Sequence, residues 1–323
     1  MHFDSLPYKT KQFFFVLIKL SIVIAAFYLI YQKIIHNTEF NIKQFWSFLK
    51  ESHVFSLKTI IFLLLLTGFN WFFEILKWQT LVRSITSISI KKALEQSLAA
   101  LTASLLTPNR IGEYGAKAIY FRAGQRKQVM LLNLLGNVSQ MATTLVFGSI
   151  GLWLMYLSYD LNINTTKLSY LMIIVVSILA FVAFGLRQTK FKIKGFSLEK
   201  LKVFFLSLSL NLHVYIIVLS LIRYSIFSFQ FYVLLLLFGV DFNYLEAMTI
   251  ITTMYLLVSV LPSIFIFDVV VKGSVAVYLF SLAGINAFTI LSIVMIMWVL
   301  NFVLPSVFGS YYVLNFNLPK TDD

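Results

Sequence analysis

Residues 105–127 of this 323-residue chain read LLTPNRIGEYGAKAIYFRAGQRK. Pro108 ends an apolar run, and the charged residues Arg110, Glu113 and Lys117 follow it among glycines. Proline cannot continue a helix, because it lacks the backbone N–H and its ring clashes with the preceding turn. The stretch therefore predicts a turn between two short helices, with Glu113 and Lys117 on one face of the second helix at the spacing i, i+4.

The composition places the chain in a membrane. Hydrophobic residues make up 59% of it and charged residues 12%, whereas soluble domains carry about 25% charged residues. Apolar runs of the ~20 residues that cross a bilayer as a helix recur, without the polar and apolar alternation of membrane strands. We predict an all-α polytopic helical membrane bundle of about eight spans, in a single domain over residues 1–323. The predicted spans lie at about 13–35, 54–81, 129–157, 168–186, 203–222, 225–240 and 287–314, with proline-interrupted apolar stretches at about 93–107 and 245–262.

Basic residues cluster between the apolar runs. They fill a loop at 187–202, a segment at 122–127, and the surroundings of residues 81–93. Cytoplasmic loops carry an excess of Lys and Arg, so all three clusters are predicted to face the cytoplasm, with a cytoplasmic N-terminus and a plasma (inner) membrane location. The formal net charge of +13 is thereby explained by topology, and no nucleic-acid partner is expected. The third cluster consists of Lys77, Arg83, Lys91 and Lys92.

The apolar stretch at 93–107 lies between two clusters that are both predicted to be cytoplasmic. Too few residues separate it from the cluster at 122–127 for a full crossing and return. We predict a re-entrant hairpin that enters the membrane to mid-depth and turns between Pro108 and Gly112. Irregular backbone at that depth is tolerated only where protein or a water-filled cavity shelters it, so the turn should line a cavity.

A weaker copy of this segment occurs later in the chain. Leu94 to Ala118 resembles Leu245 to Gly273 in a Leu-Glu start, a helix rich in Thr, Ser and Ala, a proline, and an acid followed four residues later by Lys. Paired proline-interrupted segments often mark the binding site of a transporter. The predicted half-repeats cover about 54–157 and 203–314, and their relative orientation is left open. Corresponding residues are Glu95 and Glu246, Pro108 and Pro262, Glu113 and Asp268, and Lys117 and Lys272.

Arg110 is the strongest candidate for a ligand contact. A guanidinium beside backbone N–H groups freed by Pro108 and Gly112, at the start of a helix, predicts an anion site that suits a phosphodiester. The acid and base pairs could equally be structural, fixing helix register. The predicted lipid- or anion-binding residues are Pro108, Arg110, Gly112, Glu113, Lys117, Asp268 and Lys272, with Arg122, Glu95, Glu246 and Pro262 as secondary candidates.

Enzyme signatures are missing from the sequence. It has no P-loop, no G-x-S-x-G and no H-E-x-x-H, and it contains no Cys and four scattered His. We therefore expect no catalytic residues, no metal site, no cofactor and no enzymatic activity.

The stretch TPNRIGEYGAKAIYFRAG, within such a bundle, resembles the flippase-like transmembrane region of the lysylphosphatidylglycerol synthases. The family's P-x-R-x-G-E type signature is matched by Pro108, Arg110, Gly112 and Glu113. Two departures concern Lys117, where Arg at about +3 from the Glu is expected, and PSIFIFD in the second half, where many relatives have a glycine-rich run ending in Glu. The aminoacyltransferase domain of the full synthase is not expected after the final NLPKTDD.

The resemblance implies a protein that moves modified phospholipids between leaflets, with membrane lipids and possibly a separate lipid-modifying enzyme as partners. The leading hypothesis is therefore binding and translocation of a phospholipid or lipid-linked head group. An ion- or proton-coupled transporter of small solutes would use the same acid and base pairs as a relay. A membrane-embedded transferase acting on lipid-linked substrates is the third hypothesis.

Overall fold

The computed structural model describes residues 56–105, 107, 110–159, 192–193, 196–260 and 265–317, with the isolated residues 21, 24 and 28. For residues 192–193, 196–200 and 265–271 only the backbone is described. Helices dominate, and a two-stranded antiparallel ribbon precedes α8. The elements are α3 (Leu57–Val82), α4 (Ile90–Ser104), α5 (Gly112–Ala118), η3 (Ala123–Gln125), α6 (Arg126–Ser158), β1 (Lys192–Ile193), β2 (Phe196–Ser197), α8 (Leu198–Ser207), α9 (Leu210–Leu237), α10 (Tyr244–Val260), α11 (Phe265–Ser281), α12 (Ala287–Trp298), the π-helix η4 (Val299–Val303) and α13 (Leu304–Leu314).

The predicted helical membrane bundle is confirmed. Within the described residues, four helical stretches are long and apolar enough to cross a membrane. Their outward faces carry large apolar side chains such as Phe69 and Trp153, as expected of helices that meet lipid rather than water. The four stretches are Leu57–Val82, Ala123–Ser158, Leu210–Leu237 and Ala287–Leu314.

The prediction of two separate spans at 203–222 and 225–240 is wrong. The chain forms the short helix α8 and then one continuous helix, α9, which Ser209 caps by accepting a hydrogen bond from the Leu212 N–H. Arg223 lies in the middle of α9 and not in a loop. The charge of Arg223 suggested a break in the apolar run. Arginine does not interrupt a helix, however, and Arg223 pairs with Glu74 of α3.

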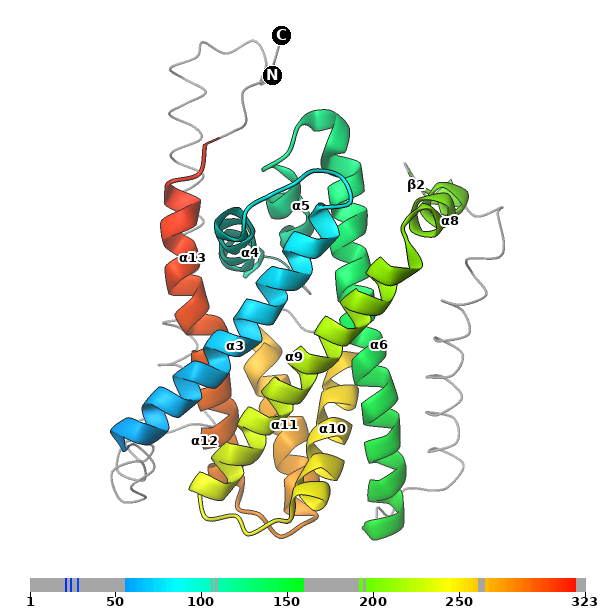
Figure 1. Cartoon of the computed structure of the whole chain (residues 1–323). Coiled ribbons are helices and arrows are strands. Elements are labelled where there is room, and N and C mark those ends of the chain that lie inside the picture. The colour runs from blue at the N-terminus through cyan, green and yellow to red at the C-terminus, as the bar shows by residue number, and fades with distance from the viewer. Residues whose placement is uncertain are drawn as a thin grey trace.

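Two helical hairpins enter the bundle from opposite ends (Figure 1). α4 and α5 pack together at the upper end, α4 beside α3 and α13 and α5 beside α6, whereas α10 and α11 pack together and connect to α9 and α12 at the lower end. α3 runs upward and α6 downward in this view, while α9 runs downward and α12 and α13 run upward. The two groups of helices are therefore inverted relative to each other, which decides the orientation that the sequence left open. The exact limits predicted for the two half-repeats stay a prediction.

Each hairpin packs against a helix of the other group. α10 packs on α6, where a side chain on Gly151 would collide with Thr252, and α4 packs on α13, where one on Gly309 would collide with Thr102. The Thr102 hydroxyl also donates a hydrogen bond of 2.9 Å to the Ser306 carbonyl oxygen. Small residues at such crossings let helix backbones approach closely. The two inverted groups of helices therefore pack against each other at two equivalent crossings.

Candidate functional site

The turn between α4 and α5 has a strained backbone. Arg110 has a φ of +57°, which is the left-handed region that residues with a side chain rarely adopt. Thr107 closes the turn, because its hydroxyl accepts a 2.8 Å hydrogen bond from the Gly112 N–H. A Cβ on residue 112 would lie 2.8 Å from the Thr107 side chain, so the position requires glycine. The backbone N–H that was predicted to be free for a ligand is therefore already occupied, and Pro108 lies outside the described residues.

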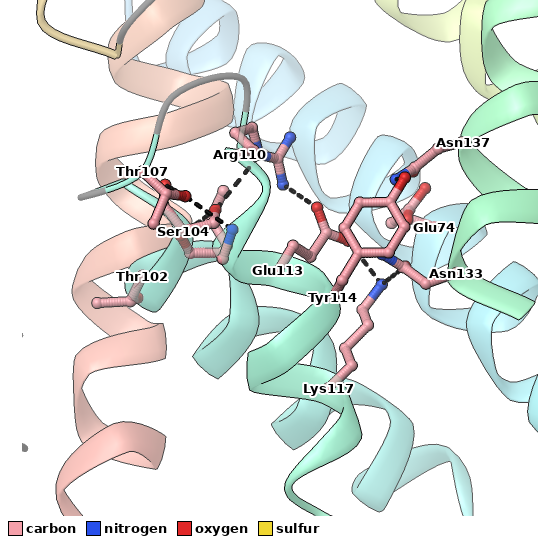
Figure 2. Close-up of polar contacts among 12 residues, drawn as sticks. Glu74, Thr102, Ser104, Thr107, Arg110, Glu113, Tyr114, Lys117, Asn133 and Asn137 are labelled. Atoms are coloured by element: carbon pink, nitrogen blue, oxygen red, sulfur yellow. Dashed lines mark hydrogen bonds and ion pairs between the residues drawn. The ribbon is translucent and has the colours of Figure 1, made fainter. Parts of the chain in front are cut away.

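Glu113 is held between two cations (Figure 2). Its Oε2 accepts a 3.0 Å bond from Arg110 Nη2, and its Oε1 accepts a 2.7 Å bond from Lys117 Nζ. The carboxylate side chain is 8% exposed and that of Lys117 is 2% exposed. The structure thus brings together the three charged residues that the sequence singled out in this stretch.

Lys117 lies behind Glu113 and not at the surface of a cavity. Its Nζ also donates a 2.8 Å hydrogen bond to Asn133 Oδ1 of α6 and lies 4.3 Å from the centre of the Trp78 ring. Asn137, one turn farther along α6, donates a 3.1 Å hydrogen bond to the Tyr114 hydroxyl. These contacts fix α5 on α6, so Lys117 positions Glu113 and the turn.

A cavity of about 650 Å³ opens beside this turn. Three cationic side chains line it, Arg110 of the turn, Arg223 of α9 and Lys272 of α11, and the Glu113 carboxylate also belongs to its lining. The Lys272 Nζ and the Arg110 Cζ lie 4.9 and 5.9 Å from the centre of the same ring, that of Phe302. The remaining wall is largely aromatic and apolar and includes Tyr224, Phe227, Phe231, Tyr255, Met254 and Trp298.

A second charged cluster supports the cavity from α3. Glu74 Oε2 lies 2.8 Å from Lys77 Nζ and 2.9 Å from Arg223 Nη1. Lys77 was predicted to face the cytoplasm with the basic residues near 81–93, and this is wrong, because it is buried inside α3. Glu74 lies three residues before Lys77 within an apolar run, and this spacing could have predicted their ion pair. The contact of Glu74 with Arg223 joins residues distant in sequence and had no such signal.

No group of three or more His, Asp or Glu side chains that could hold a metal ion is present in the part of the chain that the structure describes.

A family model described as the lysylphosphatidylglycerol synthase TM region matches residues 16–309. The chain belongs to this family. Searches of curated proteins and of solved structures gave no match.

The other predicted residues of this lysylphosphatidylglycerol synthase TM region lie away from the cavity or outside the described part. Glu95 pairs with Lys92 at 3.0 Å, and Glu246 accepts a 3.2 Å hydrogen bond from the Tyr159 hydroxyl. Arg122 is exposed at the start of η3. Pro262 lies outside the described residues, as does the side chain of Asp268, whose backbone lies in α11.

Proposed function

We propose that this membrane protein binds the head group of a phospholipid or lipid-linked molecule in its cavity and assists its passage between leaflets. The observation that carries the proposal is the lining of the cavity, to which Arg110, Arg223 and Lys272 contribute three cationic side chains among aromatic and apolar ones. Cationic hydrogen-bond donors in an apolar, aromatic surrounding are chemically suited to a phosphate joined to acyl chains. Membership of the lysylphosphatidylglycerol synthase TM family supports a role connected with membrane lipids.

Arg110 would bind the phosphate by exchanging partners. In the structure one edge of its guanidinium is bonded to Glu113 at 3.0 Å. A phosphate offers the same planar fork a bidentate acceptor, while Glu113 keeps its 2.7 Å bond to Lys117. The carboxylate therefore need not be left unpaired when the ligand takes its place on Arg110.

The proposal extends to the cellular setting. The chain would be a non-enzymatic, multi-pass protein of the plasma (inner) membrane with a cytoplasmic N-terminus. Its partners would be membrane lipids, with a separate lipid-modifying enzyme supplying the substrate.

Replacing Arg110 with Gln tests this role. Charge-assisted hydrogen bonds contribute about 1.5 to 3 kcal/mol, so we expect phospholipid translocation in reconstituted vesicles to slow by about tenfold or more. Lys92→Gln is the matched control, because Lys92 is an exposed cation in an i, i+3 ion pair outside the cavity. Equal rates for the Arg110→Gln variant and the unmodified protein would refute the proposed role.

An ion- or proton-coupled transporter of small solutes is the second candidate. It is favoured by the burial of two carboxylates, Glu74 and Glu113, each between two cations, since intramembrane ionisable residues commonly form proton relays. Solute flux that follows an imposed pH gradient and is indifferent to lipid composition would select this candidate over lipid translocation.

A further inference from the structure

We infer that the cavity contains a hydrogen-bond-accepting subsite, formed by Asn70 of α3 and Gln140 of α6, for a head group that carries hydroxyl or ammonium donors beside its phosphate. The inference rests on the proposed function and specifies the chemistry of the ligand. It follows from the direction of a chain of buried amide side chains, of which Asn70 and Asn301 line the cavity.

The chain of amides starts at Gln230 of α9. Gln230 Nε2 donates hydrogen bonds of 3.1 Å to the Leu63 carbonyl oxygen and 2.9 Å to the Thr67 hydroxyl. A backbone carbonyl can only accept, so the NH₂ group of Gln230 must face Leu63. Its Oε1 must then face the other way, where it accepts a 2.9 Å bond from Asn301 Nδ2.

The orientation of the Asn301 amide determines that of the Asn70 amide. Its Nδ2 also donates a 3.1 Å bond to the Met297 carbonyl oxygen, which fixes the orientation of its amide a second time. Its Oδ1 accordingly accepts a 2.8 Å bond from Asn70 Nδ2. Asn301 lies in the π-helix η4, a kind of distortion that often occurs at functional sites.

Asn70 is therefore left with its oxygen as the free end of the chain. The residue is 2% exposed and lines the cavity, and its Oδ1 has no hydrogen-bond partner in the described part of the structure. Buried polar atoms are rarely left unsatisfied in native proteins, and each exception calls for an explanation. A donor group on a bound ligand would satisfy this oxygen.

Gln140 repeats the arrangement on the facing helix. Its Nε2 donates to the Ser220 carbonyl oxygen at 3.4 Å, so the NH₂ group is turned toward α9. Its Oε1 is buried without a partner among the described residues, and Gln140 also lines the cavity. Two amides from different helices that line the same cavity thus each have a buried acceptor without a described partner, and a backbone carbonyl or the amide chain fixes the orientation of each amide.

Arg223 supplies the complementary donor near these acceptors. It lies on α9 one turn from Ser220, and Glu74, which holds its Nη1 at 2.9 Å, lies one turn from Asn70 on α3. The Nε of Arg223 is buried without a partner in the described region. The cavity therefore pairs donors for a phosphate with acceptors for neutral hydroxyls or an ammonium, as a phosphodiester head group with its own donors requires.

Two lipids of equal charge distinguish binding through the acceptor subsite from binding through the phosphate alone. Phosphatidylglycerol and phosphatidylmethanol are both anionic phosphodiesters, but only the first carries hydroxyl donors beyond the phosphate. In native mass spectrometry of the purified full-length protein, we expect phosphatidylglycerol to bind at least about fivefold more tightly, which corresponds to one net hydrogen bond. Phosphatidylethanolamine, measured alongside, shows whether an ammonium is accepted as well as a hydroxyl.

Variants at the two amides assign the preference to the subsite. Asn70→Leu and Gln140→Met should each weaken phosphatidylglycerol binding toward the level of phosphatidylmethanol, and leave phosphatidylmethanol binding unchanged. Thr67→Val is the matched control, because it removes a bond at the far end of the amide chain while Gln230 keeps Leu63 as its partner. Should Asn70→Leu fail to fold, Gln140→Met still provides the test, because its amide is outside that chain.

The outcomes distinguish this inference from the proposed function. If phosphatidylmethanol binds as tightly as phosphatidylglycerol and phosphatidylethanolamine, the acceptor subsite is refuted while lipid binding stands. The same holds if both variants weaken all three lipids equally. If none of the lipids binds to the unmodified protein, the proposed function fails and the inference fails with it.

Discussion

Replacing Lys117 with Met should lower the free energy of unfolding by about 3 to 5 kcal/mol, because it leaves the buried Glu113 carboxylate without its closest cation. Lys117 Nζ lies 2.7 Å from Glu113 Oε1 and is itself 2% exposed. The substitution also removes the bond to Asn133 that ties α5 to α6. The change can be measured by unfolding the purified protein in mixed detergent micelles.

Two further variants establish that the loss comes from the Glu113 charge, which in the Lys117→Met protein keeps only Arg110 as a partner. Adding Glu113→Gln to Lys117→Met should restore part of the stability, since a neutral amide is far less costly to bury than a carboxylate. Lys92→Met is the matched surface control, because Lys92 pairs with Glu95 at 3.0 Å but is 58% exposed, and it should cost less than about 1 kcal/mol. A Lys117→Met protein as stable as the Lys92→Met protein would show that the buried pair is unimportant for the fold.

The Gly151→Ala variant should be less stable than the unmodified protein by about 1 to 3 kcal/mol, the usual cost of overpacking. A Cβ at this position would collide with the Thr252 hydroxyl oxygen and lie 2.9 Å from the Thr249 carbonyl oxygen. The carbonyl belongs to the backbone of α10, so α6 and α10 must separate. Gly309→Ala should act in the same way at the equivalent crossing, where the new Cβ meets the Leu98 carbonyl oxygen of α4.

Gly68→Ala is the control for these glycine variants. Gly68 is also inside a long helix, α3, but a Cβ there meets nothing within 4 Å. Alanine is favoured over glycine in a helix by up to about 1 kcal/mol, so this variant should be at least as stable as the unmodified protein. If Gly151→Ala also raises the midpoint of thermal unfolding, the two crossings are looser than the structure has them.

The features that follow from local spacing could be predicted from the sequence. The apolar runs gave the helical bundle, and the interval of four residues placed Glu113 and Lys117 on one helix face, where they pair. The two interrupted segments were recognisable because proline and glycine act on the backbone locally. Family membership was likewise predictable from the motif around Arg110, and the match over residues 16–309 confirms it.

Features that depend on contacts between distant helices could not be read in this way. Arg223 suggested the end of a span because its partner, Glu74, lies on another helix, and Lys77 resembled a loop residue because the same acid neutralises it. The amide chain from Gln230 to Asn70 involves three helices, and none of its members carries a charge that would single it out. Partners on other helices offset the free-energy cost of burying these polar side chains, and the sequence does not show those partners.

The crossing of α4 with α13 also constrains how the chain is assembled during synthesis. Thr102 bonds to the Ser306 carbonyl oxygen, 204 residues farther along, so the first hairpin emerges from the ribosome long before the helix that completes its packing. Until then the face of α4 around Thr102 has no native cover and must be sheltered by lipid, by the translocation machinery or by other helices. A nascent chain released before residue 309 would therefore expose this face. The native packing of α4 can be completed only after α13 has been synthesised.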